Sequence, residues 1–178
     1  MELYPGSEVV SEDTIRIAPG IELSIPANQP RGKRVLSREE VEAALAVPNS
    51  TRPAAPVPPQ LKANKQAKSG LVAAGETHYG CAYERVCLYS DAGFVTGYKL
   101  SFYTCAFVDL GGVNFPTGGK WNDRMSAYVN NQTDGTTSIF YNWNGASNWS
   151  VMFSTVAIDW NSNVGSTYND KMDAIRVC

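Results

Sequence analysis

Histidine is almost absent from this chain of 178 residues, since His78 is the only one. A Ser-His-Asp or Cys-His relay therefore has a single candidate for its general base, at the edge of the region richest in predicted strands. Glycine-rich phosphate-binding motifs are also missing, and no pair of carboxylates stands out from the acidic residues in turn-forming sequence. We therefore expect no enzymatic activity.

Long apolar runs and an excess of positive charge are missing too. No stretch approaches the roughly 18 consecutive apolar residues of a membrane-spanning helix. The formal net charge is −2, which predicts no broad basic surface for nucleic acid. The first residues, MELYPGSEVV, show neither the basic start nor the apolar core of a signal peptide. We expect a monomer with no membrane span and no nucleic-acid partner.

Cysteines are few and confined to the second half of the chain, at Cys81, Cys87, Cys105 and Cys178. An even count in a small β-rich segment favours two disulfides and an oxidising compartment. Among the three possible pairings we expect Cys81–Cys87 with Cys105–Cys178. Zinc held by His78 and three cysteines is the alternative, but the gap from Cys81 to Cys87 is wider than zinc motifs use. We expect a secreted protein whose signal sequence has been removed and Met1 added.

The N-terminal part lacks the features of a core-forming domain. Thr14–Ile25 (TIRIAPGIELSI) alternates on either side of Ala-Pro-Gly and predicts a hairpin, which needs a partner surface because two strands alone are marginal. Ser37–Ala46 opens with a capping box and predicts a short helix. The Pro- and Ala-rich stretch that follows predicts an extended linker. We expect an N-terminal extension over 1–47, a linker over 48–75 and a folded domain over 76–178.

That domain contains an internal repeat. Trp121–Asn130 reads WNDRMSAYVN and Tyr168–Val177 reads YNDKMDAIRV, and the two share Asn, Asp, Met and Ala without gaps at an offset of 169 − 122 = 47 residues. Each copy follows a predicted hairpin. The alternating apolar residues of the second hairpin strands are Tyr98, Leu100 and Phe102 in the first copy and Trp149, Val151 and Phe153 in the second. With no helical period present, two four-strand units predict an all-β, antiparallel sandwich of two Greek keys.

These segments resemble a known superfamily. CLYSDAGFVTGYKLSF resembles the first half of a βγ-crystallin Greek key, and WNDRMS and YNDKMD resemble the double-Asn/Asp calcium motif of that superfamily. The spacing of Cys81 and Cys87 before CLY further resembles the secreted actinobacterial (Streptomyces-type) metalloproteinase-inhibitor family. The resemblance covers roughly residues 78–178. It implies a βγ-crystallin-like domain that inhibits a secreted metalloproteinase.

The resemblance also implies calcium sites shared between the two motifs. Carried over by position, the ligands are Asn122, Asp123, Arg124 (carbonyl), Ser126, Asn169, Asp170, Lys171 (carbonyl) and Asp173. The sequence departs from the pattern at the fifth position of the second motif, where Asp173 replaces Ser or Thr, and at the sixth positions, which are alanine. Inward-pointing Arg124 and Lys171 would weaken cation binding. The alternative is that the Asn-Asp pairs only cap a turn.

The functional loop is not assigned by the sequence. The candidate inhibitory loops are Asp109–Lys120 and Asp159–Thr167, both rich in Gly and Asn. The alternative function is a calcium-stabilised module that binds cell wall or carbohydrate, or acts as an antimicrobial or toxin-like protein. The tryptophans either form an exposed platform for such a ligand or fill the core and corners of the sandwich; they are Trp121, Trp143, Trp149 and Trp160.

Overall fold

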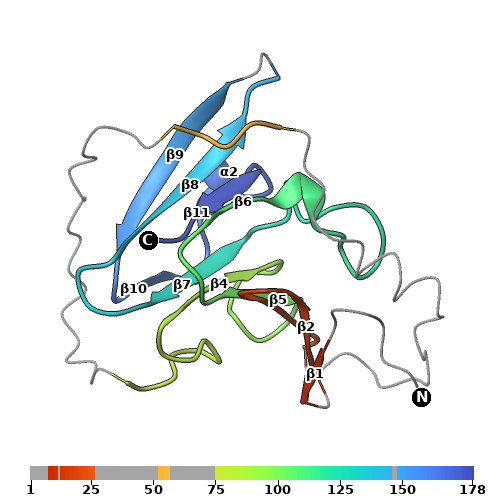
Figure 1. Cartoon of the computed structure of the whole chain (residues 1–178), viewed down its shortest axis with the longest axis vertical. Helices are drawn as coiled ribbons and strands as arrows, with labels where there is room; N and C mark the ends of the chain where they lie inside the picture. Colours follow the sequence, from red (N-terminus) through yellow and green to blue (C-terminus); the bar gives the residue numbers. More distant parts are fainter. Residues whose placement is uncertain (1–7, 12, 27–51, 57–74, 146–147) are drawn as a thin grey trace.

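The fold of the chain is given by a computed structural model that describes residues 8–11, 13–26, 52–56, 75–145 and 148–178. These residues form a seven-stranded and a four-stranded antiparallel sheet (Figure 1). The helix expected over Ser37–Ala46 lies outside the described residues. Within those ranges, no helix is long and apolar enough to cross a membrane.

Each half of the folded domain supplies four strands and one short helical turn. The first half contains β4 (Arg85–Tyr89), β5 (Lys99–Phe102), β6 (Phe107–Asp109), the 3-10 turn η1 (Leu110–Gly112) and β7 (Ala127–Asn131). The second half contains β8 (Thr137–Trp143), β9 (Trp149–Val156), β10 (Asp159–Asn161), α2 (Gly165–Tyr168) and β11 (Ala174–Arg176). The two halves therefore repeat one supersecondary unit, as the sequence repeat predicts.

The two units interlock by exchanging their third strands. The order β5-β4-β7-β10 in the larger sheet places β10 of the second unit beside β7 of the first. The order β6-β11-β8-β9 in the smaller sheet places β6 of the first unit beside β11 of the second. This reciprocal arrangement confirms the all-β, βγ-crystallin-like sandwich of two Greek keys.

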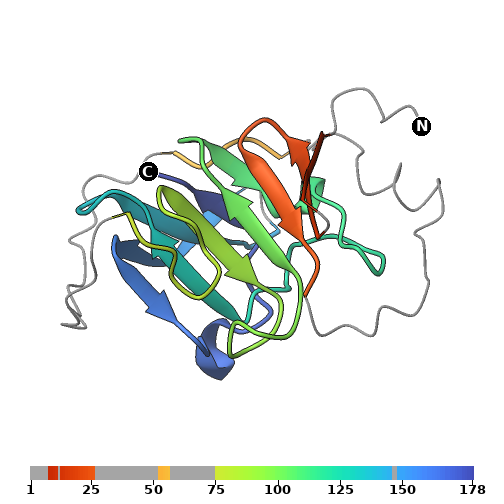
Figure 2. The ribbon, with the colours of Figure 1, turned by 90° about the horizontal axis from the view of Figure 1, so that it is seen from below.

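The N-terminal hairpin extends the larger sheet. β2 (Thr14–Ala18) and β3 (Ile21–Ser24) form the predicted hairpin, preceded by β1 (Glu8–Ser11), and β3 pairs with β5 (Figure 2). The sheet order is therefore β1-β2-β3-β5-β4-β7-β10. Ile17, Ile21 and Leu23 are buried in the main core. The partner surface that a lone hairpin needs is thus the edge of the first Greek key.

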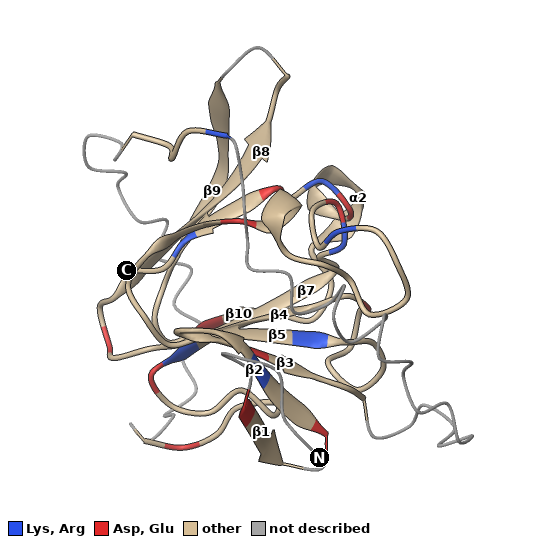
Figure 3. Cartoon of the chain, turned by 45° about the vertical axis from the view of Figure 1, so that its right-hand side comes forward, with Lys and Arg blue, Asp and Glu red and all other residues tan. Residues whose placement is uncertain are grey.

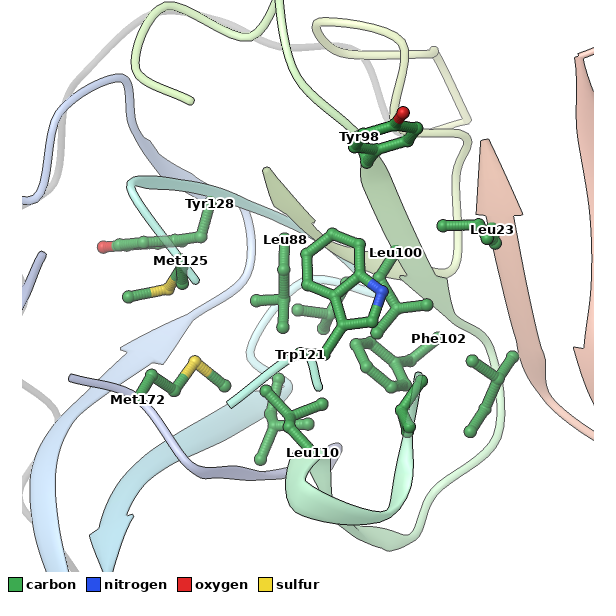
Figure 4. Packing of buried hydrophobic residues seen from close by; sticks show 14 of the residues in the cluster. Leu23, Leu88, Tyr98, Leu100, Phe102, Leu110, Trp121, Met125, Tyr128 and Met172 are labelled. Carbon is green, nitrogen blue, oxygen red and sulfur yellow. The ribbon is translucent and has the colours of Figure 1, made fainter. Parts of the chain in front are cut away.

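The main core lies between the two sheets. Trp121 is fully buried among Leu88, Leu100, Phe102 and Leu110, which come from β4, β5 and η1 (Figure 4). The predicted alternation in β5 holds, since Tyr98, Leu100 and Phe102 all enter this core. Trp121, at the start of the first repeated stretch, is therefore a core residue rather than part of an exposed platform.

The predicted alternation in β9 is wrong. The β8–β9 register shifts between Phe140 and Tyr141, so the inner and outer faces exchange along β9. Phe153 packs on the main core, whereas Trp149 packs with Tyr141 in a second cluster on the outer face. A strict two-residue period cannot anticipate this irregularity.

Both disulfides join the expected cysteines, Cys81 with Cys87 and Cys105 with Cys178. The first closes a short loop at the entry to β4. The second joins residues 73 positions apart and ties the last residue to the β5–β6 connection. No free cysteine remains among the described residues, so the zinc alternative has no thiolate ligands.

Candidate functional site

The two Asn-Asp stretches form two turns of the same local geometry. Asp123 and Asp170 have left-handed backbone conformations, with φ of 58° and 53°, which aspartate tolerates better than most residues. In each turn the asparagine side-chain amide donates to the following aspartate, at 2.8 Å from Asn122 and 2.6 Å from Asn169. The two repeated stretches thus share their side-chain hydrogen bonds as well as their sequence and backbone conformation.

The structure brings the two turns together across an approximate two-fold relation. The N–H of Asp123 donates to the carbonyl of Met172 at 2.8 Å, and the N–H of Asp170 donates to the carbonyl of Met125 at 3.1 Å. Met125 and Met172 are both fully buried. The predicted site residues of the two copies therefore share one region at the centre of the domain.

The two basic residues of the motifs point away from this region. The Arg124 guanidinium lies over the Phe115 ring, 4.7 Å from its centroid. The Lys171 ammonium donates to the carbonyls of Ser166 and Thr167 at 3.1 and 3.0 Å, in the last turn of α2. The condition under which Arg124 and Lys171 would weaken cation binding, that they point inward, is therefore not met.

The fifth positions of the motifs differ in their partners. The Ser126 hydroxyl donates to the Ser90 carbonyl at 2.9 Å, which leaves its lone pairs as acceptors. The Asp173 carboxylate accepts a hydrogen bond from the backbone N–H of Trp143 at 2.8 Å and lies 3.7 Å from the Arg52 guanidinium. Burial raises the pKa of Asp173, and neighbouring Asp123 raises it further, while the Trp143 N–H, Arg52 and Asn122 lower it. Asp173 is thus close to Asn122 and Asp123 of the opposite turn.

Arg52 is the site residue that the sequence reading missed. It comes from the Pro- and Ala-rich stretch expected to be a linker. Its guanidinium makes two hydrogen bonds to the Asp109 carboxylate, at 2.7 and 2.5 Å, besides its ion pair with Asp173. The only signal was composition, because Arg52 is the single charged residue between Val47 and Leu61.

The residues present fit calcium better in one half of the region than in the other. No group of three or more His, Cys, Asp or Glu side chains suited to a metal occurs in the described ranges, so a site would depend on carbonyl, amide and hydroxyl oxygens as well. Ser126, next to the Asp170–Met125 bond, has acceptor capacity free. Around Asp173, by contrast, the Arg52 guanidinium already supplies a positive charge.

The first candidate loop, Asp109–Lys120, contains a narrow exposed tip. Asn114 and Lys120 pair as an isolated bridge, and the Lys120 ammonium donates to the Asn114 side chain at 2.5 Å. Two backbone bonds close the turn between Phe115 and Gly119. The buried Phe115 ring packs on Tyr98 and Trp121, at 5.2 and 5.1 Å between centroids. The hydrogen bonds and the buried Phe115 ring at the base of the loop thus fix the position of its exposed tip.

The second candidate loop, Asp159–Thr167, is more closely integrated with the domain. The Asp159 carboxylate accepts bonds from Tyr128 and Thr155 at 2.8 and 2.6 Å. The N–H of Val164 donates to the Ser126 carbonyl at 3.0 Å, and the Val164 side chain is buried. This loop therefore follows the surface of the sandwich instead of protruding from it.

His78 lies in an aromatic environment. Its ring stacks near Trp160, with centroids 6.4 Å apart, and Trp160 also contacts Tyr79 at 5.6 Å. Nε2 of His78 is buried and accepts or donates no hydrogen bond within the described part of the chain. The geometry thus gives no support to a nucleophile–histidine relay at this residue.

Comparisons with known proteins add one structural match. No protein-family model and no curated protein matches the chain. Among solved structures, a betagamma-crystallin domain from Flavobacterium johnsoniae is similar at 26% identity and a TM-score of 0.37, covering 52% of this chain and 92% of that one. The strand order described above remains the basis for the fold.

Proposed function

We propose that this protein is a secreted, non-enzymatic inhibitor of a metalloproteinase that presents the loop Asn114–Lys120 to its target. The observation that carries the proposal is the form of this loop. Its tip, Thr117 to Gly119, is exposed, whereas Phe115 at its base is buried against two aromatic rings. A loop that is already ordered loses little conformational entropy on binding, which favours tight association with a proteinase cleft.

The two disulfides support the secretion and the stable fold that this proposal requires. The two disulfides are typical of proteins that act in an oxidising environment. An inhibitor exposed to proteinases benefits from a cross-linked fold, and the second disulfide joins Cys105 to Cys178 across 73 positions. We propose that it acts as a monomer.

The experiment titrates the full chain against a panel of secreted metalloproteinases that includes a thermolysin-like enzyme. Inhibition predicts a stoichiometric loss of peptidase activity. The variant Thr117→Arg, at the exposed tip, should weaken inhibition by about tenfold, a change of about 1.4 kcal/mol. Thr133→Arg is the matched control, because Thr133 is an exposed threonine in the β7–β8 turn. Cleavage of the chain with full retention of proteinase activity would exclude this function.

A calcium-stabilised binding module is the second candidate. It is favoured by the two left-handed aspartates and by the free acceptor capacity of Ser126. Calcium should then raise the melting temperature at millimolar concentration. The double variant Asp123→Asn with Asp170→Asn should abolish the rise while tolerating the left-handed backbone. Identical melting curves with calcium and with chelator would show that calcium does not stabilise the protein.

The ligand of such a module would be a cell-wall or other glycan. Tyr79 is 50% exposed and stacks on Phe94 at 4.5 Å between centroids, beside Trp160. Aromatic faces of this kind offer an apolar surface with polar edges. Sedimentation with insoluble glycan, lost in Tyr79→Ala, would support this candidate. A protein that stays in the supernatant with every glycan and cell type tried would argue against it.

A further inference from the structure

A short segment from the Pro- and Ala-rich stretch lies on the outer face of the four-stranded sheet. Residues 52–56 (Arg-Pro-Ala-Ala-Pro) cross β9 and β8 in Figure 1. They cover an apolar cluster formed by Ile139, Tyr141, Trp149 and Ala174, with Phe107 and Trp143 at its margin. β8 and β9 contain no acidic or basic residue (Figure 3). These two strands are thus uncharged, and the cluster beneath the segment is apolar and aromatic.

The arginine of the segment is bound by groups that match a guanidinium. Asp109 receives it through two hydrogen bonds and Asp173 through an ion pair, a fork geometry that arginine satisfies and lysine does not. The guanidinium also lies over Trp149 and Trp143, 5.1 and 5.4 Å from the ring centroids. This arrangement selects one side-chain type.

Gly111 leaves room for this guanidinium. A Cβ at position 111 would lie 2.0 Å from a terminal nitrogen of Arg52 and 3.1 Å from the Asp109 carboxylate. No left-handed conformation requires glycine here, because Gly111 does not have a positive φ. The absence of a side chain therefore serves the approach of the guanidinium.

The main chain of the segment is recognised as well. The Trp149 indole N–H donates to the Pro53 carbonyl at 2.7 Å, and the Arg176 guanidinium donates to the Ala55 carbonyl at 2.5 Å. The Ala55 side chain is 3% exposed within the cluster, whereas Ala54 is exposed. The sheet face thus contacts the segment through two carbonyls two residues apart, one buried small side chain and one arginine, and these are contacts that an extended peptide can make.

The larger sheet carries an equivalent cover that is held covalently. Tyr89 and Tyr141 occupy matching positions, each opposite an alanine of the neighbouring strand. Over Tyr89, the chain around Tyr79 is bonded to the Tyr89 hydroxyl at 2.7 Å and fixed by the Cys81–Cys87 disulfide. Over Tyr141, residues 52–56 contain no cysteine. The second cover is thus attached to the sheet by non-covalent contacts, which a competing peptide can replace.

We propose that the outer face of the four-stranded sheet is a peptide-binding site for a partner protein that carries an extended segment with arginine, then proline, and alanine three positions after the arginine. The chain's own residues 52–56 occupy this site in cis and compete with the partner. The site shares no residue with the loop Asn114–Lys120, so it stands or falls independently of proteinase inhibition.

The test uses the full chain and a fluorescent peptide, STRPAAPVP, that copies residues 50–58. Two variants displace the cis segment by different means. Arg52→Glu places a carboxylate against Asp109 and Asp173, and Ala55→Phe adds a large side chain at a buried position. A tethered segment competes at an effective concentration on the order of millimolar, so both variants should bind the peptide at least about tenfold more tightly than the natural chain.

Matched controls distinguish specific recognition of the peptide from a general loosening of the protein in the variants. Ala54→Phe changes the neighbouring, exposed alanine and should leave peptide affinity at the value of the natural chain. A peptide with alanine in place of its arginine should bind the displaced variants at least about tenfold more weakly. Equal binding of both peptides would overturn the proposal, as would folded Arg52→Glu and Ala55→Phe proteins that bind neither.

The natural chain provides an independent measurement if either variant fails to fold. A spin-labelled STRPAAPVP peptide at millimolar concentration should broaden the indole NMR resonances of Trp149 and Trp143, and unbroadened resonances would overturn the proposal. Sedimentation of the natural chain tests whether a second copy of the chain occupies the site. Dimers of the natural chain that the peptide dissociates would assign the site to a second copy of this chain instead of a foreign partner.

Discussion

Tyr89 and Tyr141 occupy equivalent places in the two sheets but differ in one hydrogen bond. Tyr89 lies opposite Ala127, and Tyr141 lies opposite Ala174. The Tyr89 hydroxyl donates to the Tyr79 carbonyl at 2.7 Å. The Tyr141 hydroxyl is buried and has no hydrogen-bond partner within the described residues. Two related positions thus provide a measurement of what one hydrogen bond contributes.

The pair predicts opposite responses to the same substitution. Tyr89→Phe removes a satisfied bond and should lower the free energy of unfolding by about 1 kcal/mol. Tyr141→Phe removes an unpaired buried hydroxyl and should leave stability unchanged or raise it slightly. Burial raises the pKa of Tyr89 well above its usual value, so the hydroxyl remains a donor at ordinary pH. Urea denaturation of both variants checks this, and equal losses would contradict it.

The sequence predicts the fold here more fully than the site. The repeated stretch and the alternation in β5 suffice for two Greek keys, because turns and two-residue periods are local features. The reversal of faces along β9 depends on a register shift opposite Phe140 and Tyr141, which no local pattern signals. Arg52 was missed for a similar reason, since its partners Asp109 and Asp173 lie 57 and 121 positions away.

Two glycines test whether the N-terminal hairpin is part of the folded unit. Gly20 and Gly135 have nearly the same left-handed backbone, with φ of 81° and 83°. A Cβ at Gly20 would lie 2.3 Å from the Thr104 hydroxyl, whereas a Cβ at Gly135 would meet nothing within 4 Å. Both alanine variants should lose about 1 kcal/mol from backbone strain.

Gly20→Ala should lose more than Gly135→Ala, because it also pushes β2 and β3 away from the chain after β5. The Gly20 carbonyl accepts the Tyr103 N–H at 3.0 Å, so that contact is lost with it. Hydrogen exchange should quicken over β3 in Gly20→Ala alone. Equal stability losses and unchanged exchange over β3 would show that the hairpin attaches only loosely.

The two disulfides should differ in their contribution to stability. Loop-closure entropy in the unfolded chain grows with the number of residues enclosed. Replacing Cys105 and Cys178 by alanine opens a loop of 73-residue separation and should cost about 4 kcal/mol, while replacing Cys81 and Cys87, 6 apart, should cost about 2 kcal/mol. Chemical denaturation under non-reducing conditions measures both. A larger loss from the short loop would mean that local packing dominates over chain entropy.

Arg52 should oppose calcium at the half of the site that contains Asp173. Its guanidinium is 3.7 Å from the Asp173 carboxylate, so a divalent cation there would meet a like charge at close range. On the calcium-dependent account, Arg52→Gln should therefore increase the rise in melting temperature that calcium produces. The comparison is between calcium and chelator for each protein, which cancels any change in the stability of the apo form.

Arg124→Gln is the control for that experiment. It removes the same charge from the motif itself, but the Arg124 guanidinium lies over Phe115 and not over the carboxylates. Its calcium response should match that of the natural chain. If Arg124→Gln and Arg52→Gln raise the response equally, net charge is responsible rather than the position of Arg52. If neither variant responds to calcium, the Asn-Asp stretches act as turns that join the two Greek keys through Asp123 and Asp170.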